Sequence, residues 1–314
     1  MSLFLGIDTS NYTTSCAVYD SESGEVRSVK KLLPVKSGEK GIRQSDAVFH
    51  HTKQLPLLME QLADKSERIG YVSYSCAPRN VQGSYMPCFL VGESAARCIS
   101  AACGAKCFVT HHQTGHILAA LYSAKRLDLL KSNRSFLAFH ISGGTTDMLL
   151  CKPDEEKVLD IEMIGCSLDL KAGQAVDRVG LMLGLDFPCG AELEKFAVKS
   201  NAEFSVRPVL KGLDCCLSGV ENKCEKMIKS GMSPEDTARF CLEYIGKTIA
   251  AMTKGAVEKY GDMPVIFAGG VMSDKLIRDM LSSVCEGYFA EPEYSCDNAV
   301  GVALFGAIKE GAVL

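Results

Sequence analysis

Short apolar runs on either side of small polar turns open both halves of the chain. Residues 3–8 form a short apolar run that ends in Asp8; the polar stretch Thr9–Thr14 follows, and then a second apolar run, Cys16–Tyr19. Two apolar runs around a turn of small polar residues predict a β-hairpin. The same pattern returns at Phe136–Cys151, around the turn Ser142–Thr146. The sequence therefore predicts two halves that each begin with a strand, a turn and a strand.

Apolar residues at helical spacing and further short apolar runs predict the remaining elements. In the first half these are strands at 26–33, 71–75 and 107–110, with helices at 44–64, 89–103 and 112–125. In the second half they are strands at 158–164, 265–268 and 287–290, with helices at 171–184, 190–199, 219–229, 234–259, 274–282 and 298–309. This order predicts an α/β fold with two lobes, residues 1–133 and 134–297. We expect the closing helix within 298–314 to pack back on the first lobe.

Composition narrows the classes of function. Of the 314 residues 47% are hydrophobic and 23% charged, and the net charge is −4. These values are typical of a folded globular protein and exclude one that coats nucleic acid by its bulk charge. No run approaches the roughly 18 apolar residues of a membrane helix, and the first residues do not form an export signal, so we expect a cytoplasmic protein without a membrane partner.

The 15 cysteines follow no disulfide or zinc spacing. In a chain without an export signal, scattered cysteines are typical of reduced thiols. Cys98, Cys103 and Cys107 lie close together in the sequence, but their spacing matches no zinc pattern. We interpret these three as buried thiols.

Three loops rich in Gly or Thr follow apolar strands. They are Asp8–Thr14, Ser142–Asp147 and Ala268–Val271. Small residues let backbone N–H groups approach an anion closely, and ligands of α/β proteins collect at the carboxyl ends of strands. A single loop of this kind is usually just a turn, whereas two opening hairpins and a late Gly-Gly loop resemble the actin/sugar-kinase-like fold. That resemblance implies an active site in the cleft between the lobes, with an adenine nucleotide close to both Gly-Gly pairs, Gly143, Gly144, Gly269 and Gly270.

His112 and His116 stand four residues apart at the start of a predicted helix. They therefore project from one face and can share a metal ion such as zinc, iron, nickel or copper. The alternative is that the two histidines only cap the helix or pack. Asp297, at the start of the closing helix, is a candidate third ligand, and its alternative role is that of a helix N-cap.

Six segments together resemble one known family. The chain is similar to the TsaD (Gcp/YgjD) family of tRNA threonylcarbamoyladenosine transferases, formerly labelled O-sialoglycoprotein endopeptidases. The segments are Thr110–His116, Phe139–Asp147, Gly173–Gly190, Leu217–Gly219, Ala268–Leu276 and Cys296–Asn298, which occur in the family's order and extend the likeness over most of the chain.

The resemblance implies both a reaction and a set of site residues. A carbamoyl-threonine group would pass from threonylcarbamoyl-adenylate to the exocyclic amine of a tRNA adenine, with release of AMP. One divalent metal, iron or zinc, would be held by His112, His116 and Asp297. An adenine nucleotide or adenylate, with the presence of magnesium left open, would be bound by Asp8, Thr9, Ser10, Ile141, Ser142, Gly143, Gly144, Thr145, Asp177, Gly190, Gly269, Gly270 and Asp274. The implied partners are tRNA and further subunits of a transfer complex.

The chain departs from the family's pattern at several positions, five of which bear on the reaction. Tyr12 and Thr13 replace acidic residues, Thr145 replaces a histidine, Gln174 a glutamate and Asp274 an asparagine. These departures leave open a divergent paralogue that binds nucleotide and metal for a different small-molecule transfer or a scaffold role. A metallopeptidase is disfavoured because the chain lacks a His-Glu-x-x-His motif.

One segment is locally basic. Arg27–Lys53 contains seven Lys or Arg against two acids, on a chain that is acidic overall. Such a segment can contact the phosphates of tRNA. The alternatives are that the charges only solvate a surface, or that a partner subunit covers them.

Overall fold

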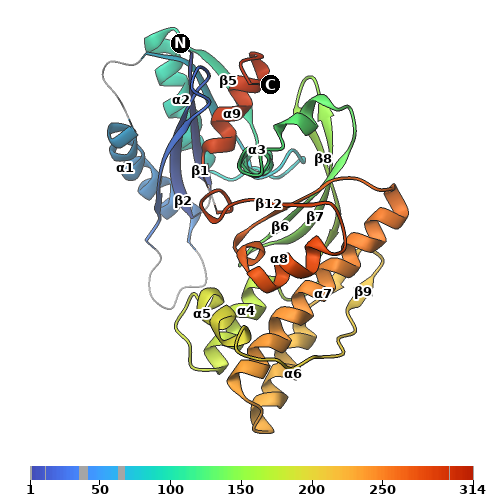
Figure 1. Ribbon diagram of the computed structural model, residues 1–314. Coiled ribbons are helices and arrows are strands. Elements are labelled where there is room, and N and C mark those ends of the chain that lie inside the picture. Colours follow the sequence, from blue (N-terminus) through green and yellow to red (C-terminus); the bar gives the residue numbers. More distant parts are fainter. Residues whose placement is uncertain (1, 11, 35–41, 63–67, 297, 314) are drawn as a thin grey trace. The chain divides into compact units, whose positions relative to one another are not determined.

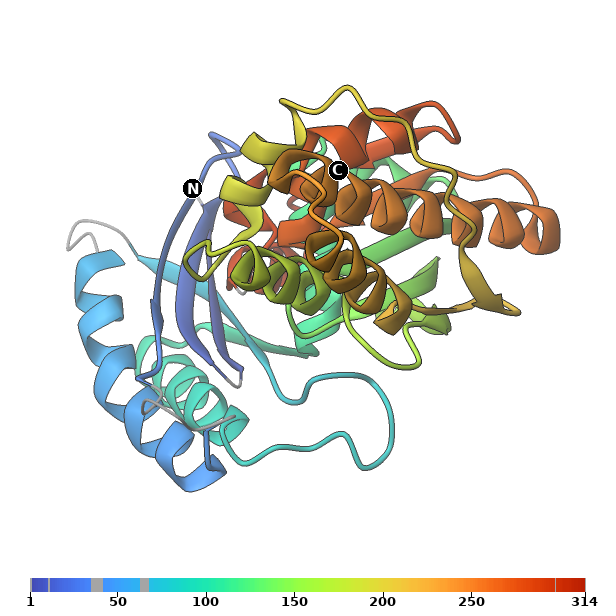
Figure 2. The ribbon, with the colours of Figure 1, turned by 90° about the horizontal axis from the view of Figure 1, so that it is seen from below.

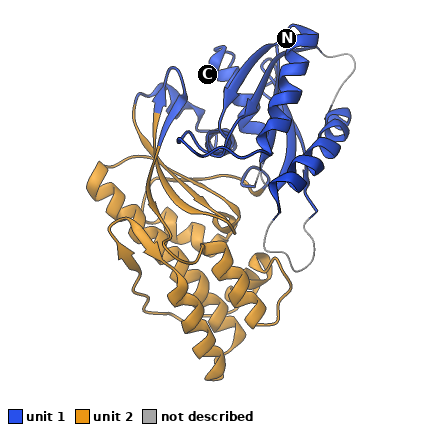
Figure 3. Cartoon of the chain, turned by 180° about the vertical axis from the view of Figure 1, so that it is seen from behind, with its two compact units in different colours: residues 1–133, 153–161, 293–314 blue, residues 134–152, 162–292 orange. Residues whose placement is uncertain are grey.

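The computed structural model describes residues 2–10, 12–34, 42–62, 68–296 and 298–313 (Figure 1). The chain forms two compact units, shown in different colours in Figure 3. Unit 1 comprises Met1–Asn133, Pro153–Ile161 and Glu293–Leu314, and unit 2 comprises Arg134–Lys152 and Glu162–Pro292. Relative to a division after residue 133, the segments 153–161 and 293–297 belong to unit 1.

Unit 1 is built on a five-stranded sheet in the order β3-β2-β1-β4-β5. Its strands are β1 (Leu3–Ser10), β2 (Thr13–Asp20), β3 (Val26–Leu32), β4 (Ile69–Ser75) and β5 (Lys106–Thr110). Its helices are α1 (Gln44–Leu62), α2 (Phe89–Cys103), α3 (His112–Ser123), η1 (Leu127–Lys131), η3 (Pro292–Tyr294) and α9 (Val300–Lys309). β1, β2 and β3 are antiparallel neighbours, whereas β4 and β5 run parallel to β1.

The alternation of side chains along β1 determines what lies on each face of this sheet. Leu5 and Ile7 belong to the core cluster that contains residues of α1 and α2, and these two helices lie side by side in both views (Figures 1 and 2). Phe4 belongs to the cluster that contains residues of α3 and α9. Asp8 has the same parity as Phe4, so β1 directs it toward the face covered by α3.

Helix α9 makes an unusually close approach to both α3 and β1. A Cβ atom built at Gly301 would overlap the carbonyl oxygen of Gly115, and one built at Gly6 would overlap the backbone of α9 at Ala303. Because Gly115 lies between His112 and His116, this glycine contact fixes the helix that carries the histidine pair.

Unit 2 has a second five-stranded sheet in the order β12-β11-β6-β7-β8. Its strands are β6 (Phe136–Ile141), β7 (Thr146–Asp154), β8 (Val158–Cys166), β11 (Val265–Ala268) and β12 (Gly287–Phe289). Its helices are α4 (Ala172–Met182), α5 (Gly190–Ala197), α6 (Ser218–Lys229), α7 (Pro234–Tyr260), η2 (Gly270–Ser273) and α8 (Lys275–Ser282). The short strands β9 (Val209–Lys211) and β10 (Asp214–Cys216), which the sequence did not predict, form a separate ribbon.

The core of unit 2 lies between its sheet and the helices α4 to α8. Leu137, Phe139 and Ile141 of β6 alternate into this core, which also contains residues of the long helix α7. Ser233 starts α7 by accepting a hydrogen bond from the N–H of Asp236, and Pro234 occupies the first turn, where no amide donor is needed. This packing holds β6 and α4 beneath the turn that joins β6 to β7.

Two findings bear on the expectations from composition. Among the described residues, no helix is long and apolar enough to cross a membrane. The cysteines are free, but the interpretation of Cys98, Cys103 and Cys107 as buried thiols was wrong. Cys98 and Cys103 are exposed and Cys107 is half-buried. Cys98 faces away from the buried residues Gly92 and Ala96 of α2, and Cys103 is the last residue of that helix.

The contact between α3 and α9 gives a stability prediction. Gly301→Ala should lower the free energy of unfolding by about 1–3 kcal/mol or more, because the added methyl group overlaps backbone that cannot rotate away. Urea unfolding measures the change. Gly70→Ala is the matched control, since a Cβ at that position meets nothing within 4 Å. Equal stability of the two variants would contradict the close packing of these helices.

Candidate functional site

Asp8 is a fully buried carboxylate at the end of β1, surrounded by hydrogen-bond donors. Ser10 donates to its Oδ2 at 2.6 Å, Ser75 at the end of β4 donates to its Oδ1, and Nδ1 of His112 lies 3.1 Å from both oxygens. Burial by itself raises the pKa of Asp8, but the His112 ring and the two hydroxyl donors outweigh it and hold the pKa below its ordinary value. Asp8 is therefore an ionised group held inside unit 1.

This carboxylate orients the first residue of α3. Because an ionised carboxylate only accepts, Nδ1 of His112 donates to Asp8, and Nε2 then points to the other side of the ring. The Nε2 atoms of His112 and His116 lie 2.9 Å apart. The first amides of α3 are satisfied by the loop that follows β4, where the N–H of His112 donates to the carbonyl of Ala77 at 3.0 Å. Two imidazole nitrogens thus converge, and one of their rings is fixed by a carboxylate.

The chemistry of these donors fits a metal ion. Metal-bound histidine commonly donates its other ring N–H to a carboxylate, which fixes the tautomer and the orientation of the ring. Asp8 and His112 have that arrangement. Within the described residues no group of three or more His, Cys, Asp or Glu side chains is placed to hold a metal, and Asp297, the predicted third ligand, lies outside them.

The other residues of the first loop have structural contacts. The Thr9 hydroxyl donates to the carbonyl of Cys88 at 3.0 Å and accepts from the N–H of Gly92 at 3.1 Å, which ties β1 to the start of α2. Thr13 is buried, whereas Tyr12 is 38% exposed. The two positions where the family's pattern has acidic residues thus carry a phenol ring that is partly exposed and a hydroxyl group that is buried.

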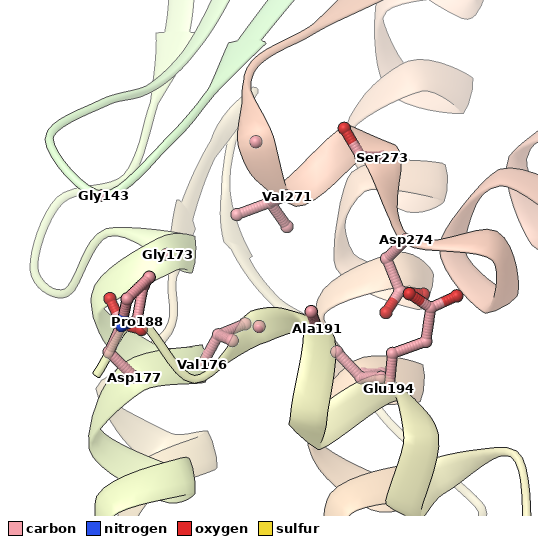
Figure 4. A pocket seen from close by; sticks show the side chains of 13 residues that line it. Gly143, Gly173, Val176, Asp177, Pro188, Ala191, Glu194, Val271, Ser273 and Asp274 are labelled. Atoms are coloured by element: carbon pink, nitrogen blue, oxygen red, sulfur yellow. The ribbon is translucent and has the colours of Figure 1, made fainter. Parts of the chain in front are cut away.

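Unit 2 contains a cavity of about 340 Å³ (Figure 4). That volume lies within the range of small-molecule sites, about 300–1,000 Å³. Five of the predicted ligand residues line it, namely Gly143, Asp177, Gly190, Gly270 and Asp274. The remaining lining residues were not among the predicted ligands, and they are Gly173, Val176, Pro188, Ala191, Glu194, Leu242, Val271 and Ser273. The turn after β6, the helices α4 and α5 and the loop after β11 thus meet around one hollow.

The turn between β6 and β7 is held by its own side chain. The N–H groups of Gly144 and Thr145 both donate to Oγ of Ser142 at 3.2 Å, and that oxygen lies 2.8 Å from Oγ1 of Thr145. The turn is consequently ordered, with two consecutive amides pointing to one oxygen atom, as in an anion-binding nest.

The glycines of this region have two different roles. Gly269 has a φ of +101°, and a Cβ there would overlap Ile141, while a Cβ on Gly173 would lie 2.6 Å from the N atom of Gly143. These two glycines allow backbones to meet. At Gly143, Gly144 and Gly270 a Cβ would meet nothing within 4 Å and φ is not positive. Gly143, Gly144 and Gly270 therefore do not serve a strained turn, and in this structure their Cα atoms face open space.

One wall of the cavity is acidic. Asp274 and Glu194 point toward each other (Figure 4), and each also accepts a backbone N–H from α8, that of Ile277 at 3.0 Å and that of Lys275 at 2.9 Å. Burial, with the nearby charge of Glu194, raises the pKa of Asp274 to about 6. The hydroxyl of Ser273 is buried on the same wall and has no hydrogen-bond partner in the described structure. A buried polar atom of this kind calls for a ligand or water.

A comparison with protein families gives a match over most of the chain. The model of the family described as "TsaD: tRNA N6-adenosine threonylcarbamoyltransferase" matches residues 28–304. The chain belongs to the TsaD family. Family membership associates it with tRNA threonylcarbamoyl transfer in general.

Solved structures of other proteins share the fold of this TsaD family member at low identity. Component A of the (R)-2-hydroxyglutaryl-CoA dehydratase of Acidaminococcus fermentans has 15% identity and a TM-score of 0.57, with 99% of both chains covered. HypF of T. kodakarensis has 14% identity and a TM-score of 0.58, over 100% of this chain and 48% of that one. A ROK family glucokinase from Streptomyces griseus has 12% identity and a TM-score of 0.52, over 98% and 100%. The fold is thus α/β and actin/sugar-kinase-like, with two five-stranded sheets.

The Asp8–His112 contact predicts a defined effect on metal binding. Asp8→Asn should weaken the affinity for zinc about 10- to 100-fold, because a neutral amide orients and polarises the ring less well than a carboxylate. Equilibrium dialysis against a zinc chelator measures the affinity. Asp46→Asn, on the exposed side of α1, is the control and should bind like the parent. Unchanged affinity in a folded Asp8→Asn variant would show that Asp8 does not support a metal ligand.

Asp274 predicts a pH dependence of stability. Its pKa is about 6 in the folded protein against an ordinary 3.8, so ionisation favours the unfolded chain. Its contribution should lower the free energy of unfolding as pH rises from about 4 to about 6, by about 2–3 kcal/mol. In urea unfolding, Asp274→Asn should therefore gain stability relative to the parent across this interval. Asp186→Asn, at an exposed position, should show no such gain, and an equal response of both variants would refute the assignment.

Proposed function

We propose that the chain is a metal-dependent transferase that moves a threonylcarbamoyl group from threonylcarbamoyl-adenylate to the exocyclic amine of a tRNA adenine. The proposal rests on one observation above others. Five of the predicted ligand residues line one cavity whose size suits a nucleotide, in a chain that matches the TsaD family model.

The cavity of unit 2 would bind the adenosine part of the donor. Ribose hydroxyls and the adenine amine are hydrogen-bond donors, and the carboxylates of Asp177 and Glu194 are acceptors on the cavity wall. Ser273 offers a buried hydroxyl without a partner. For the phosphate, the turn Ser142–Thr145 would offer the backbone of Gly143, which lines the cavity, because the amides of Gly144 and Thr145 already donate to Ser142. Neighbours of the same fold support a nucleotide, since one was solved with AMPPNP and another with ADPNP.

Unit 1 would hold the metal. His112 and His116 would be ligands through Nε2, Asp8 would orient His112, and Asp297 is the proposed third ligand. When bound, an iron or zinc ion would act as a Lewis acid on the adenylate. Asp8 keeps its own charge compensated by Ser10, Ser75 and His112, so it can keep the His112 ring in one orientation throughout the reaction.

The proposed transfer needs no nucleophilic side chain. The adenine amine attacks the carbamoyl carbon, the bond from that carbon to the phosphate oxygen breaks, AMP leaves, and the amine loses a proton to water. The work of the protein is then to position two substrates and to stabilise charge on the phosphate. Thr145 contributes a hydroxyl to the phosphate-binding turn where relatives carry an imidazole.

We also assign tRNA contact to the basic segment Arg27–Lys53. Arg27, Lys30 and Lys31 lie exposed on β3, and Arg43 and Lys53 are exposed before and on α1. Lys36 and Lys40 fall outside the described residues. Phosphates of tRNA are the chemical complement of such a surface. We propose as well that the chain works together with partner subunits of a transfer complex.

The open glycines allow a test of the cavity without disturbing the fold. Gly270→Val should weaken AMP binding at least about tenfold in calorimetry, because its side chain enters space that the ligand needs, while urea unfolding should stay close to that of the parent. Gly70→Val in unit 1, where an added Cβ meets nothing within 4 Å and φ is not positive, is a control for added volume. If Gly270→Val binds AMP as tightly as the parent, the nucleotide does not occupy this cavity.

The proposed reaction itself predicts a specific product. Incubation of the chain, its partner subunits and zinc or iron with threonylcarbamoyl-adenylate and unmodified tRNA should yield threonylcarbamoyladenosine in the digested tRNA, measured by mass spectrometry. Lys31→Glu combined with Arg43→Glu should raise the KM for tRNA and leave AMP binding unchanged, because these side chains neutralise phosphates. Consumption of the adenylate without a modified nucleoside would instead favour the divergent paralogue with a small-molecule acceptor.

A further inference from the structure

Lys30 and Cys296 of unit 1 are far apart in sequence but make an unusually short contact. The Lys30 Nζ atom lies 2.6 Å from the Cys296 Sγ atom. Other sulfur contacts in this chain are longer, at 3.4 Å from Cys189 to the carbonyl of Asp177 and 3.7 Å from Cys285 to that of Leu281. The contact from Lys30 to Cys296 is thus shorter than these contacts, in which a thiol donates to a carbonyl oxygen.

Neighbouring contacts hold the two atoms together. Lys30 is on β3, and its Nζ also donates to the carbonyl of Glu293 at 3.3 Å. The Sγ atom of Cys296 lies 3.7 Å from the same carbonyl oxygen. Glu293 belongs to the short helix η3, which directly precedes Cys296 in the chain. One carbonyl therefore keeps the amine and the thiol side by side.

Both groups are open to small oxidants. Lys30 and Cys296 are exposed, whereas Cys16, Cys88 and Cys151 are buried. Oxidation of thiols by peroxide is favoured at accessible sulfur atoms, and a sulfenic acid condenses with a nearby nitrogen to form a sulfenamide. The exposed Cys98 and Cys103 on α2 can also be oxidised, so they provide a comparison within the same molecule.

We propose that Lys30 and Cys296 form a covalent cross-link when the protein meets hydrogen peroxide. The nucleophile, the Lys30 amine, already lies beside the Cys296 sulfur atom. Reacting atoms held at contact distance react as an intramolecular pair. No bound ligand is needed for this modification, and the inference is independent of the transferase activity.

The reaction has two balanced steps. First, the sulfur of Cys296 attacks peroxide, the O–O bond breaks, a sulfenic acid forms and one water leaves, with sulfur oxidised and peroxide reduced. Second, the neutral amine of Lys30 attacks that sulfur, a nitrogen–sulfur bond forms, the sulfur–oxygen bond breaks and a second water leaves. The cross-linked pair has lost two hydrogens in total. Excess thiol reductant returns the amine and the thiol and is itself oxidised to a disulfide.

The link would join residues 266 positions apart in the sequence. Closing so long a loop restricts the unfolded chain and therefore stabilises the folded one. It would also tie β3 to the segment that carries Cys296 and, one residue later, the proposed metal ligand Asp297.

The test is peptide mapping of the full-length protein after hydrogen peroxide and alkylation of the remaining thiols. Cleavage after basic residues should release the peptide containing Lys30 joined to the one containing Cys296, at their summed mass less two hydrogens. Cleavage at Lys30 should be lost, and thiol reductant should restore it. The midpoint of thermal unfolding should rise after peroxide and fall back after reduction.

Two variants provide matched controls. Lys30→Arg keeps the charge but lacks the nucleophilic amine, so it should form no link and show no rise in the unfolding midpoint. Lys31→Arg, whose side chain alternates to the other face of β3, should cross-link like the parent. The proposal would be overturned if peroxide converts Cys296 of the parent to a sulfur acid, as at Cys98, while the protease still cleaves after Lys30. A link that retains the oxygen atom would overturn the sulfenamide step.

Discussion

The arrangement of unit 1 depends on one buried carboxylate. An ionised group without water is costly unless its oxygens receive hydrogen bonds, and Asp8 receives them from Ser10, Ser75 and His112. Those donors come from β1, β4 and α3. The charge of Asp8 therefore brings three elements together at the carboxyl ends of β1 and β4, and removing it would take a hydrogen-bond acceptor from each of them.

Close backbone packing makes that arrangement rigid. Gly6, Gly115 and Gly301 let α9 lie against both β1 and α3, so the helix that carries His112 and His116 cannot slide. Unit 2 uses glycine in the same way at Gly173 and Gly269. It also leaves other glycines facing open space, which makes room for a ligand beside an acidic wall. Close backbone contacts at some glycines thus fix the positions of the helices and strands. Other glycines, which have no side chain, leave the volume of the cavity open.

The sequence predicted most elements because their patterns are local. Alternation and helical spacing located the strands and helices to within a few residues, and the i, i+4 spacing placed His112 and His116 on one face. The ribbon β9–β10 was missed because its three-residue strands carry too short a pattern. Of the five predicted residues that line the cavity of unit 2, Gly143 and Gly270 lie in the Gly-rich loops that follow apolar strands, whereas Asp177, Gly190 and Asp274 came from the family resemblance.

The remaining features depend on contacts between distant residues. The hydrogen bond between Asp8 and His112 joins residues 104 positions apart, and no sequence pattern predicts it. The same holds for the facing carboxylates of Glu194 and Asp274. Parity along β1 gives the only advance signal, since it places Asp8 on the α3 face once the order of the sheet is known. The exposure of Cys98 was mispredicted because an Ala-rich helix has no strong apolar stripe to show which side faces inward.

X-ray absorption spectroscopy at the metal edge of the purified protein tests the central claim most directly, that Asp8 holds His112 so that both histidines bind one metal. The account predicts two imidazole ligands at about 2.0–2.1 Å for zinc, reduced to one imidazole or none in His112→Ala. A spectrum without imidazole scattering, or one unchanged in His112→Ala, would contradict the account.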